Sequence, residues 1–126
     1  MNLSFRLKAL ALWLAAAFGG LLLYAVHLTM YTAGIVEGKQ HPILPELFWY
    51  FAVIFALPVQ TITLLVFAKN RIAIIITNII GIIYLLFGLM FGYQYGIVMG
   101  KTYLAYIAAL GILLPGIPAA WFTKKV

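Results

Sequence analysis

Charged side chains divide this 126-residue chain into four long uncharged stretches, residues 9–36, 47–68, 72–100 and 102–123. The shortest has 22 residues, and about 20 apolar residues in a helix cross the hydrocarbon core of a bilayer. Lipid gives bare backbone groups no hydrogen-bond partner, and no stretch alternates apolar and polar residues as a barrel strand does. The pattern predicts one integral membrane domain, 1–126, with spanning helices near 7–31, 45–68, 72–92 and 102–122. The third helix can continue toward Gly100.

Composition excludes most soluble classes of protein. Hydrophobic residues make up 67% of the chain and charged residues 8%, whereas soluble domains carry about 25% charged residues. Disordered segments are poor in apolar and aromatic side chains, so disorder is excluded as well. The chain has no cysteine and no aspartate, and Ser4 is its only serine, so neither thiol chemistry nor a Ser-His-Asp triad can be assembled. We therefore expect a membrane protein that is not an enzyme and that holds no cofactor or metal.

The distribution of the cations predicts the topology. The net charge of +6 comes from Lys and Arg residues scattered in ones and twos at the ends of the apolar stretches, a pattern typical of topology signals and not of a nucleic-acid surface. Six of the eight cations, in segments 6–8, 69–71 and 124–125, lie on one predicted side, and the positive-inside rule places that side in the cytoplasm. Apolar residues continue well past Ala17, so we expect an uncleaved first span. The predicted fold class is all-α: an antiparallel four-transmembrane-helix bundle in up-down-up-down order, with both termini cytoplasmic.

Glycines recur at every fourth position toward the end of the third predicted helix. Gly88, Gly92, Gly96 and Gly100 form this series, and Gly81 precedes it on nearly the same face. Small residues at this spacing let two helix backbones approach closely. The series predicts either a self-association face, which could line a narrow pore in an oligomer, or packing within one chain. We favour packing against the first or fourth helix of the same chain.

Two amides form a polar layer in the cytoplasmic half of the predicted bundle. Gln60 is eight residues from the cytoplasmic end of the second helix, and Asn78 is six or seven residues into the third. Both therefore lie about 10–12 Å below the surface. Polar groups inside a membrane need partners, so we expect both amides to face inward, bonded to each other or to carbonyls freed by Pro58. A small polar cavity open to the cytoplasm is one interpretation, and a structural amide pair, which we favour, is the other.

His27 is an ionisable residue inside the first predicted helix, and Glu37, His41 and Glu46 lie on the same side of the membrane. His27 could relay protons, bind a ligand headgroup, or ligate a metal together with His41 and Glu46. We favour a structural role, because a neutral imidazole near the interface can bond to a tyrosine or to a helix carbonyl. Glu46 follows Pro45 and has a structural role as a carboxylate at the positive end of a helix.

Three features of the second and third helices occur together: Pro58, the short basic turn Lys69-Asn70-Arg71, and Asn78 followed by Gly81. Over about a third of the chain, this combination resembles the small four-helix bacterial membrane proteins grouped as DoxX-like. Such proteins often carry an acidic residue beside the proline, where this chain has Leu57. The resemblance implies an antiparallel four-helix bundle in the bacterial inner membrane and implies no mechanism.

The sequence therefore predicts a non-enzymatic subunit of the bacterial plasma membrane that forms a homo-oligomer or binds a membrane protein partner. One alternative is a small oligomeric channel or transporter with a polar site near Gln60 and Asn78. A second alternative is a membrane enzyme or redox subunit that uses His27. The expected surroundings are the lipid bilayer, with no nucleic acid.

Overall fold

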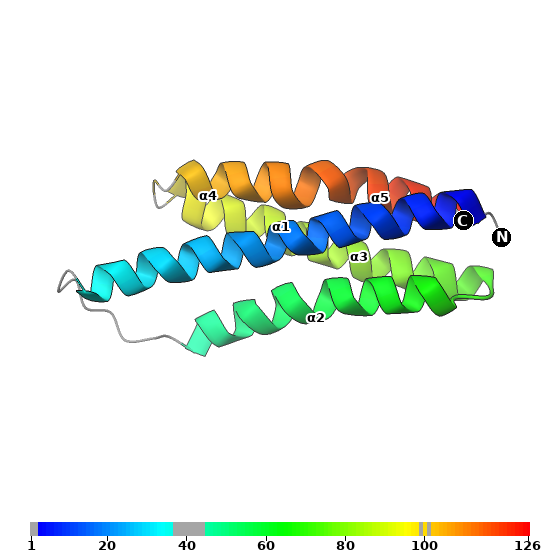
Figure 1. Ribbon diagram of the computed structural model, residues 1–126, viewed down its shortest axis with the longest axis horizontal. Helices are drawn as coiled ribbons and strands as arrows, with labels where there is room; N and C mark the ends of the chain where they lie inside the picture. Colours follow the sequence, from blue (N-terminus) through cyan, green and yellow to red (C-terminus); the bar gives the residue numbers. More distant parts are fainter. Residues whose placement is uncertain (1–2, 37–44, 99, 101) are drawn as a thin grey trace.

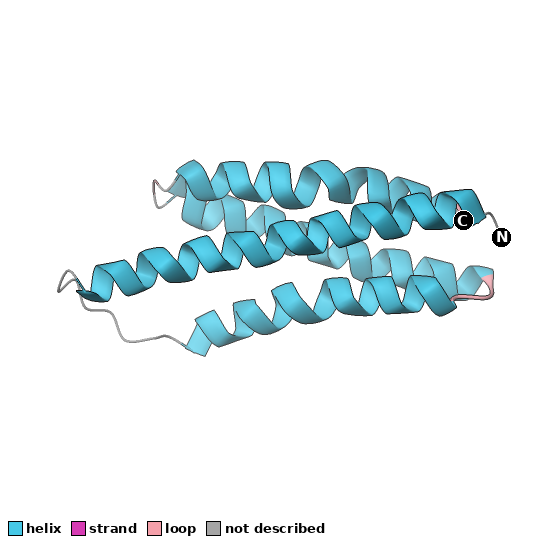
Figure 2. Cartoon of the chain, viewed as in Figure 1, coloured by secondary structure: helices cyan, strands magenta, loops and turns pink. Residues whose placement is uncertain are grey.

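The chain folds into helical rods that run side by side (Figure 1). The structure, a computed structural model, describes residues 3–36, 45–98, 100 and 102–126, and Figure 2 shows no strand among them. The elements are α1 (Leu3–Val36), α2 (Pro45–Phe67), α3 (Arg71–Phe91), the π-helix η1 (Gly92–Val98), α4 (Thr102–Ile107), the π-helix η2 (Ala108–Leu113) and α5 (Leu114–Lys125). The all-α fold class is thereby confirmed.

Two sets of consecutive elements are continuous, and each forms a single rod. The α3–η1 rod covers Arg71–Val98, and the C-terminal rod, made of α4, η2 and α5, covers Thr102–Lys125. The third predicted helix thus does continue beyond residue 92. The helix of α1 is longer than the predicted 7–31 at both ends. Among the described residues, three segments are long and apolar enough to cross a membrane, namely Leu3–Thr29 and these two rods. The described part of α2 contains a shorter apolar segment, Ala52–Phe67.

Local sequence explains the α2–α3 turn and the backbone conformation of Gly100. Asn70 is extended (φ −138°), and its side-chain oxygen accepts a hydrogen bond of 2.8 Å from the backbone N–H of Ala73, so it caps α3. The short connection between α2 and α3 makes them antiparallel neighbours. Gly100, between η1 and α4, has a φ of +76°, a conformation that glycine adopts without steric cost.

The rods form a ring in which each contacts two neighbours. α1 contacts α2 and the C-terminal rod, and the α3–η1 rod contacts the same two. α1 and α3 therefore face each other diagonally across the centre. The large side chains of Trp13 and Tyr84, both fully buried, fill this centre. The hydroxyl of Tyr84 donates a hydrogen bond of 2.8 Å to the backbone carbonyl of Ala16, which joins α3 to α1.

Both chain ends and the α2–α3 turn lie at the same end of the ring, which we call the terminal end (Figure 1). Two arginines tie this end together. The guanidinium of Arg6 donates to the carbonyls of Leu65 (2.7 Å) and Ala68 (2.8 Å), at the end of α2. The guanidinium of Arg71 donates to the carbonyl of Lys124 (3.1 Å), at the end of α5. Each arginine thus places a cation and donors at a helix C-terminus, where carbonyls lack partners and the helix dipole is negative.

Candidate functional site

Gln60 lies on the outside of the bundle. The side chain is exposed on the surface of α2, and it does not face the interior as we expected. Gln60 is seven residues before the last residue of α2, so it lies about 10 Å from that helix end. The Gln60 amide is thus a polar group on the outer surface of an apolar helix.

A second polar side chain shares this face of α2. Thr63 is exposed one helical turn after Gln60, and residues three and four apart lie on one face of a helix. Ala56 and Phe67 extend the same exposed row by one turn in each direction. We call these four residues, Ala56, Gln60, Thr63 and Phe67, the α2 stripe. The stripe presents two hydrogen-bonding groups between a small residue and a large apolar one.

Asn78 belongs to a different part of the bundle. It is half-buried on α3, and its side-chain oxygen is buried without a hydrogen-bond partner in the described residues. Asn78 lies two turns before Leu85, which contacts Gly116 of α5. Residues seven apart share one helix face, so Asn78 lies on the side of α3 that faces α5. Gln60 and Asn78 therefore do not form the expected amide pair or border one cavity.

Hydroxyl groups in the interior bond to their own helices. The hydroxyls of Thr61, Thr77 and Thr123 each donate to the carbonyl four residues earlier, at 2.7–2.8 Å. These side chains are buried, and their bonds satisfy them without a water or ligand. Each of these three hydroxyls thus has an acceptor within its own helix.

Gly81 and the glycine series pack inside the chain except at Gly100, which is exposed with open space around it. Gly81, Gly88, Gly92 and Gly96 are all buried. A Cβ added at any of them would collide with an atom from another rod. The colliding atoms belong to Trp13 of α1 for Gly81, and to Ile112, Ala108 and Ala105 of the C-terminal rod for Gly88, Gly92 and Gly96. Other helices of the same chain therefore cover all four of these glycines.

His27 is held in an aromatic environment. Its side chain is 4% exposed. The imidazole ring lies 5.3 Å from the ring of Phe91, edge to face, and 4.7 Å from the ring of Tyr95. These contacts join α1 to the end of α3 and to η1, so packing is a sufficient role for this ring.

The other residues near His27 in the predicted cluster are beyond what the structure describes. Glu37 and His41 lie outside the described residues, and Glu46 is in the first turn of α2 with an undescribed side chain. In the described part of the chain, no three His, Cys, Asp or Glu side chains come together in a way that could hold a metal ion.

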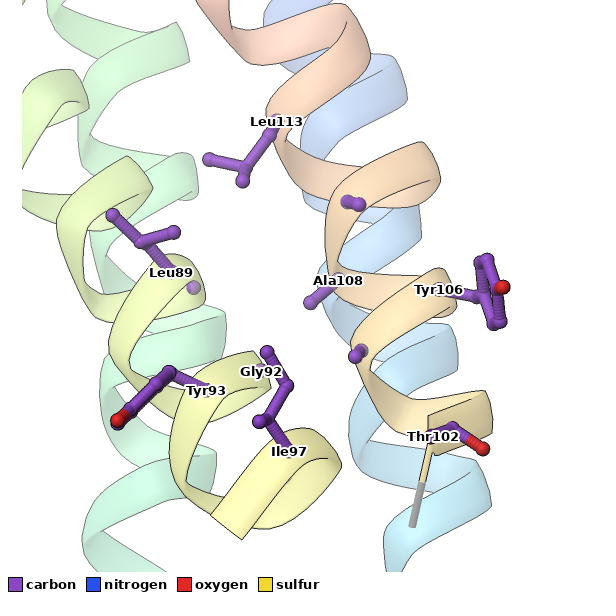
Figure 3. Close-up of a pocket in the computed structure, with 11 residues that line it drawn as sticks. Leu89, Gly92, Tyr93, Ile97, Thr102, Tyr106, Ala108 and Leu113 are labelled. Carbon is purple, nitrogen blue, oxygen red and sulfur yellow. The ribbon is translucent and has the colours of Figure 1, made fainter. Parts of the chain in front are cut away.

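An apolar groove runs between the α3–η1 rod and the C-terminal rod (Figure 3). Its lining residues lie in the half of the bundle farther from the termini. Its volume is about 430 Å³. Small residues such as Gly92 and Ala108 form part of its lining, and Leu89, Ile97 and Leu113 lie around them. η1 and η2 both contribute to it. The groove was not predicted from the sequence, because nothing in the residue pattern distinguishes these π-helices from α-helix.

Comparisons with protein-family models, with curated proteins and with solved structures find no match.

Proposed function

We propose that this chain is a four-span protein of the bacterial inner membrane, with both termini in the cytoplasm, and that it is a non-enzymatic subunit which assembles with a second copy through the α2 stripe. The exposed Gln60 carries this proposal. The DoxX-like resemblance and the apolar helices support the location, and the positive-inside rule supports the orientation.

Gln60 needs a partner that lipid cannot offer. Hydrocarbon contains no donor or acceptor, so an amide that faces it loses the hydrogen bonds it makes in water. Polar side chains within membrane helices commonly bond across helix interfaces, and each such bond contributes about 1 kcal/mol. An interface on the α2 stripe would satisfy Gln60 and would bring Thr63 to the same contact.

A second copy fits this requirement better than an unrelated helix. Two copies in one membrane have the same orientation, and a two-fold axis along the membrane normal places both Gln60 side chains at equal depth. An amide carries both donors and an acceptor, so it is complementary to itself. Such a contact is isologous, the interface type of most dimers. Ala56, one turn away, allows the two α2 helices to approach.

Cysteine cross-linking in native membranes tests the interface directly, because the natural chain has no cysteine. We expect Thr63→Cys to form a disulfide-linked dimer under mild oxidation. The matched control is Ile83→Cys, an exposed position on α3, which we expect to remain monomeric. Equal cross-linking at both positions, or none at Thr63→Cys, would overturn assembly through the α2 stripe.

A second experiment separates the stripe from the apolar groove. We expect Gln60→Leu to shift the protein from dimer to monomer in mild detergent, and Gln60→Asn, which keeps the amide, to retain the dimer. Ala109→Phe fills the groove from an exposed position and should leave the dimer intact. Dimers that survive Gln60→Leu but not Ala109→Phe would assign the interface to the groove.

A further inference from the structure

Cationic side chains gather at the terminal end of the bundle. Arg6, Lys8, Lys69, Arg71, Lys124 and Lys125 all belong to this end. The only side-chain carboxylates in the sequence, Glu37 and Glu46, belong to segments at the opposite end of α1 and α2. In the part of the chain that the structure describes, no acidic side chain lies at this end, so the cations give it a net positive charge.

The arginines and lysines at this end have different roles. Arg6 and Arg71 donate their hydrogen bonds to carbonyls at the ends of α2 and α5. Lys8, Lys124 and Lys125 are exposed. The arginines thus hold the helix ends, and the lysines remain at the surface.

Lys8 and Lys125 are positioned over one connected group of aromatic rings. The ammonium of Lys8 lies 5.6 Å from the centre of the Phe122 ring and 5.8 Å from that of Phe5. The ammonium of Lys125 lies 5.1 Å from the centre of the Trp121 ring. The rings touch in turn: Phe5 stacks on Phe122 at 5.8 Å, and Phe122 meets Trp121 edge to face at 5.1 Å.

This arrangement restricts two flexible side chains while leaving their donors available. A cation over an aromatic ring gains about 0.5–1 kcal/mol at an exposed site. An ammonium has three N–H donors, and an interaction with a ring face leaves some of them free for an acceptor. Trp121, which is 54% exposed, is of a residue type that prefers the headgroup level of a membrane. In the membrane location proposed above, Trp121 therefore places the two ammoniums near the headgroups.

We propose that Lys8 and Lys125, with Phe5, Trp121 and Phe122, form a binding site for the headgroup of an anionic phospholipid. The lipid phosphate accepts hydrogen bonds from both ammoniums, and its acyl chains lie along α1 and α5. The site rests on the membrane location proposed above but not on assembly through the α2 stripe. The lipid site is on α1 and α5, whereas the α2 stripe is on α2. Either proposal can therefore fail while the other holds.

Native mass spectrometry of the purified protein tests the site with two probes, dioleoyl phosphatidylglycerol and the zwitterionic dioleoyl phosphatidylcholine. Each lysine near an anionic headgroup contributes about a five-fold gain in binding. We expect Lys8→Gln and Lys125→Gln each to weaken phosphatidylglycerol binding about five-fold. Trp121→Leu, which removes one ring but no charge, should weaken it about two-fold or more.

Lys69→Gln is the matched control, since it removes the same charge from the same end but from outside the aromatic group. We expect it to change phosphatidylglycerol binding less than about two-fold. Equal losses for Lys69→Gln and Lys8→Gln would overturn the site, because overall charge would then explain binding. Equal binding of the two lipids by the natural protein would also overturn it. Binding of neither lipid would overturn the site as well, but not the membrane location, because a membrane protein in detergent can lose its lipids.

Chemical labelling gives a readout that needs no variant. We expect Lys8 and Lys125 of the natural protein to be acetylated more slowly in phosphatidylglycerol vesicles than in phosphatidylcholine vesicles, relative to Lys69. Uniform protection of all three lysines would contradict a defined site even if every variant failed to fold.

Discussion

The indole N–H of Trp13 donates a hydrogen bond of 2.8 Å to the hydroxyl of Thr123, and both side chains are fully buried. These residues are 110 positions apart, so the bond joins the first rod to the last. The hydroxyl of Thr123 in turn donates to the carbonyl of Ala119 in its own helix. One threonine therefore satisfies the polar atom of the largest buried side chain at the centre of the ring.

Replacing Thr123 by valine should destabilise the protein by about 1–3 kcal/mol. Valine has nearly the same shape, but it leaves the buried indole N–H without an acceptor. Unfolding of the purified protein in mixed micelles measures the difference. The control is Thr29→Val, since the exposed hydroxyl of Thr29 bonds only within α1, and its loss should cost less than about 0.5 kcal/mol. Similar losses for both variants would show that the Trp13 bond contributes little.

Arg6 should stabilise the end of α2 more than its charge alone explains. We expect Arg6→Met to lower the free energy of unfolding by about 1.5–3 kcal/mol, because carbonyls at the helix end lose charged donors. Lys69→Met removes a cation from the same end and should have a smaller effect. Denaturant titrations of both variants in detergent give the comparison. A larger loss for Lys69→Met would refute the capping role.

Gly19 should tolerate no side chain. A Cβ at this position would overlap the backbone carbonyl of Gly111 in η2, so α1 and the C-terminal rod meet through bare backbone. We expect Gly19→Ala to cost about 1–3 kcal/mol or more, because the rods must separate. Ala15→Val adds bulk at an exposed position of the same helix and serves as the control. Comparable thermal stability of Gly19→Ala and the natural protein would contradict this contact.

The proposed orientation predicts which residues are accessible from outside the cell. Lys69 lies in the α2–α3 turn at the terminal end, and Tyr103 lies in the first turn of α4 at the other end. An impermeant maleimide should label Tyr103→Cys in intact cells and Lys69→Cys only after the membrane is opened. The reverse pattern would invert the topology, and labelling of both in intact cells would reject a membrane span between them.

The sequence predicted the rods well but not which way their faces point. Rod boundaries follow from charges, from Asn70 as a cap and from Gly100 at a turn, and each of these acts locally. The inward face of a membrane helix is harder to predict, because lipid and protein core are equally apolar. The prediction of the inward face therefore rested on polar residues alone. It placed Gln60 inside the bundle, whereas its side chain is exposed on α2.

The candidate site shows the same limit. Gln60 and Asn78 could be selected from sequence as polar residues in apolar stretches, and their depths are similar. Their separation depends on the rotation of α2 and α3 about their axes. The bond from Tyr84 to Ala16 of α1 helps to fix the rotation of α3. Such long-range packing has no local signature in the sequence.

The π-helix η2 also has a consequence for the length of the C-terminal rod. A π-helical turn bonds residues five apart where an α-helix bonds residues four apart, so it accommodates one residue more in the same rise. Deleting a single residue between Ala108 and Leu113 would restore ordinary helical spacing and leave the faces of α4 and α5 in register. Elsewhere in the rod, the same deletion would rotate everything beyond it by about 100°. The chain thus contains a place where its length can change without changing its shape.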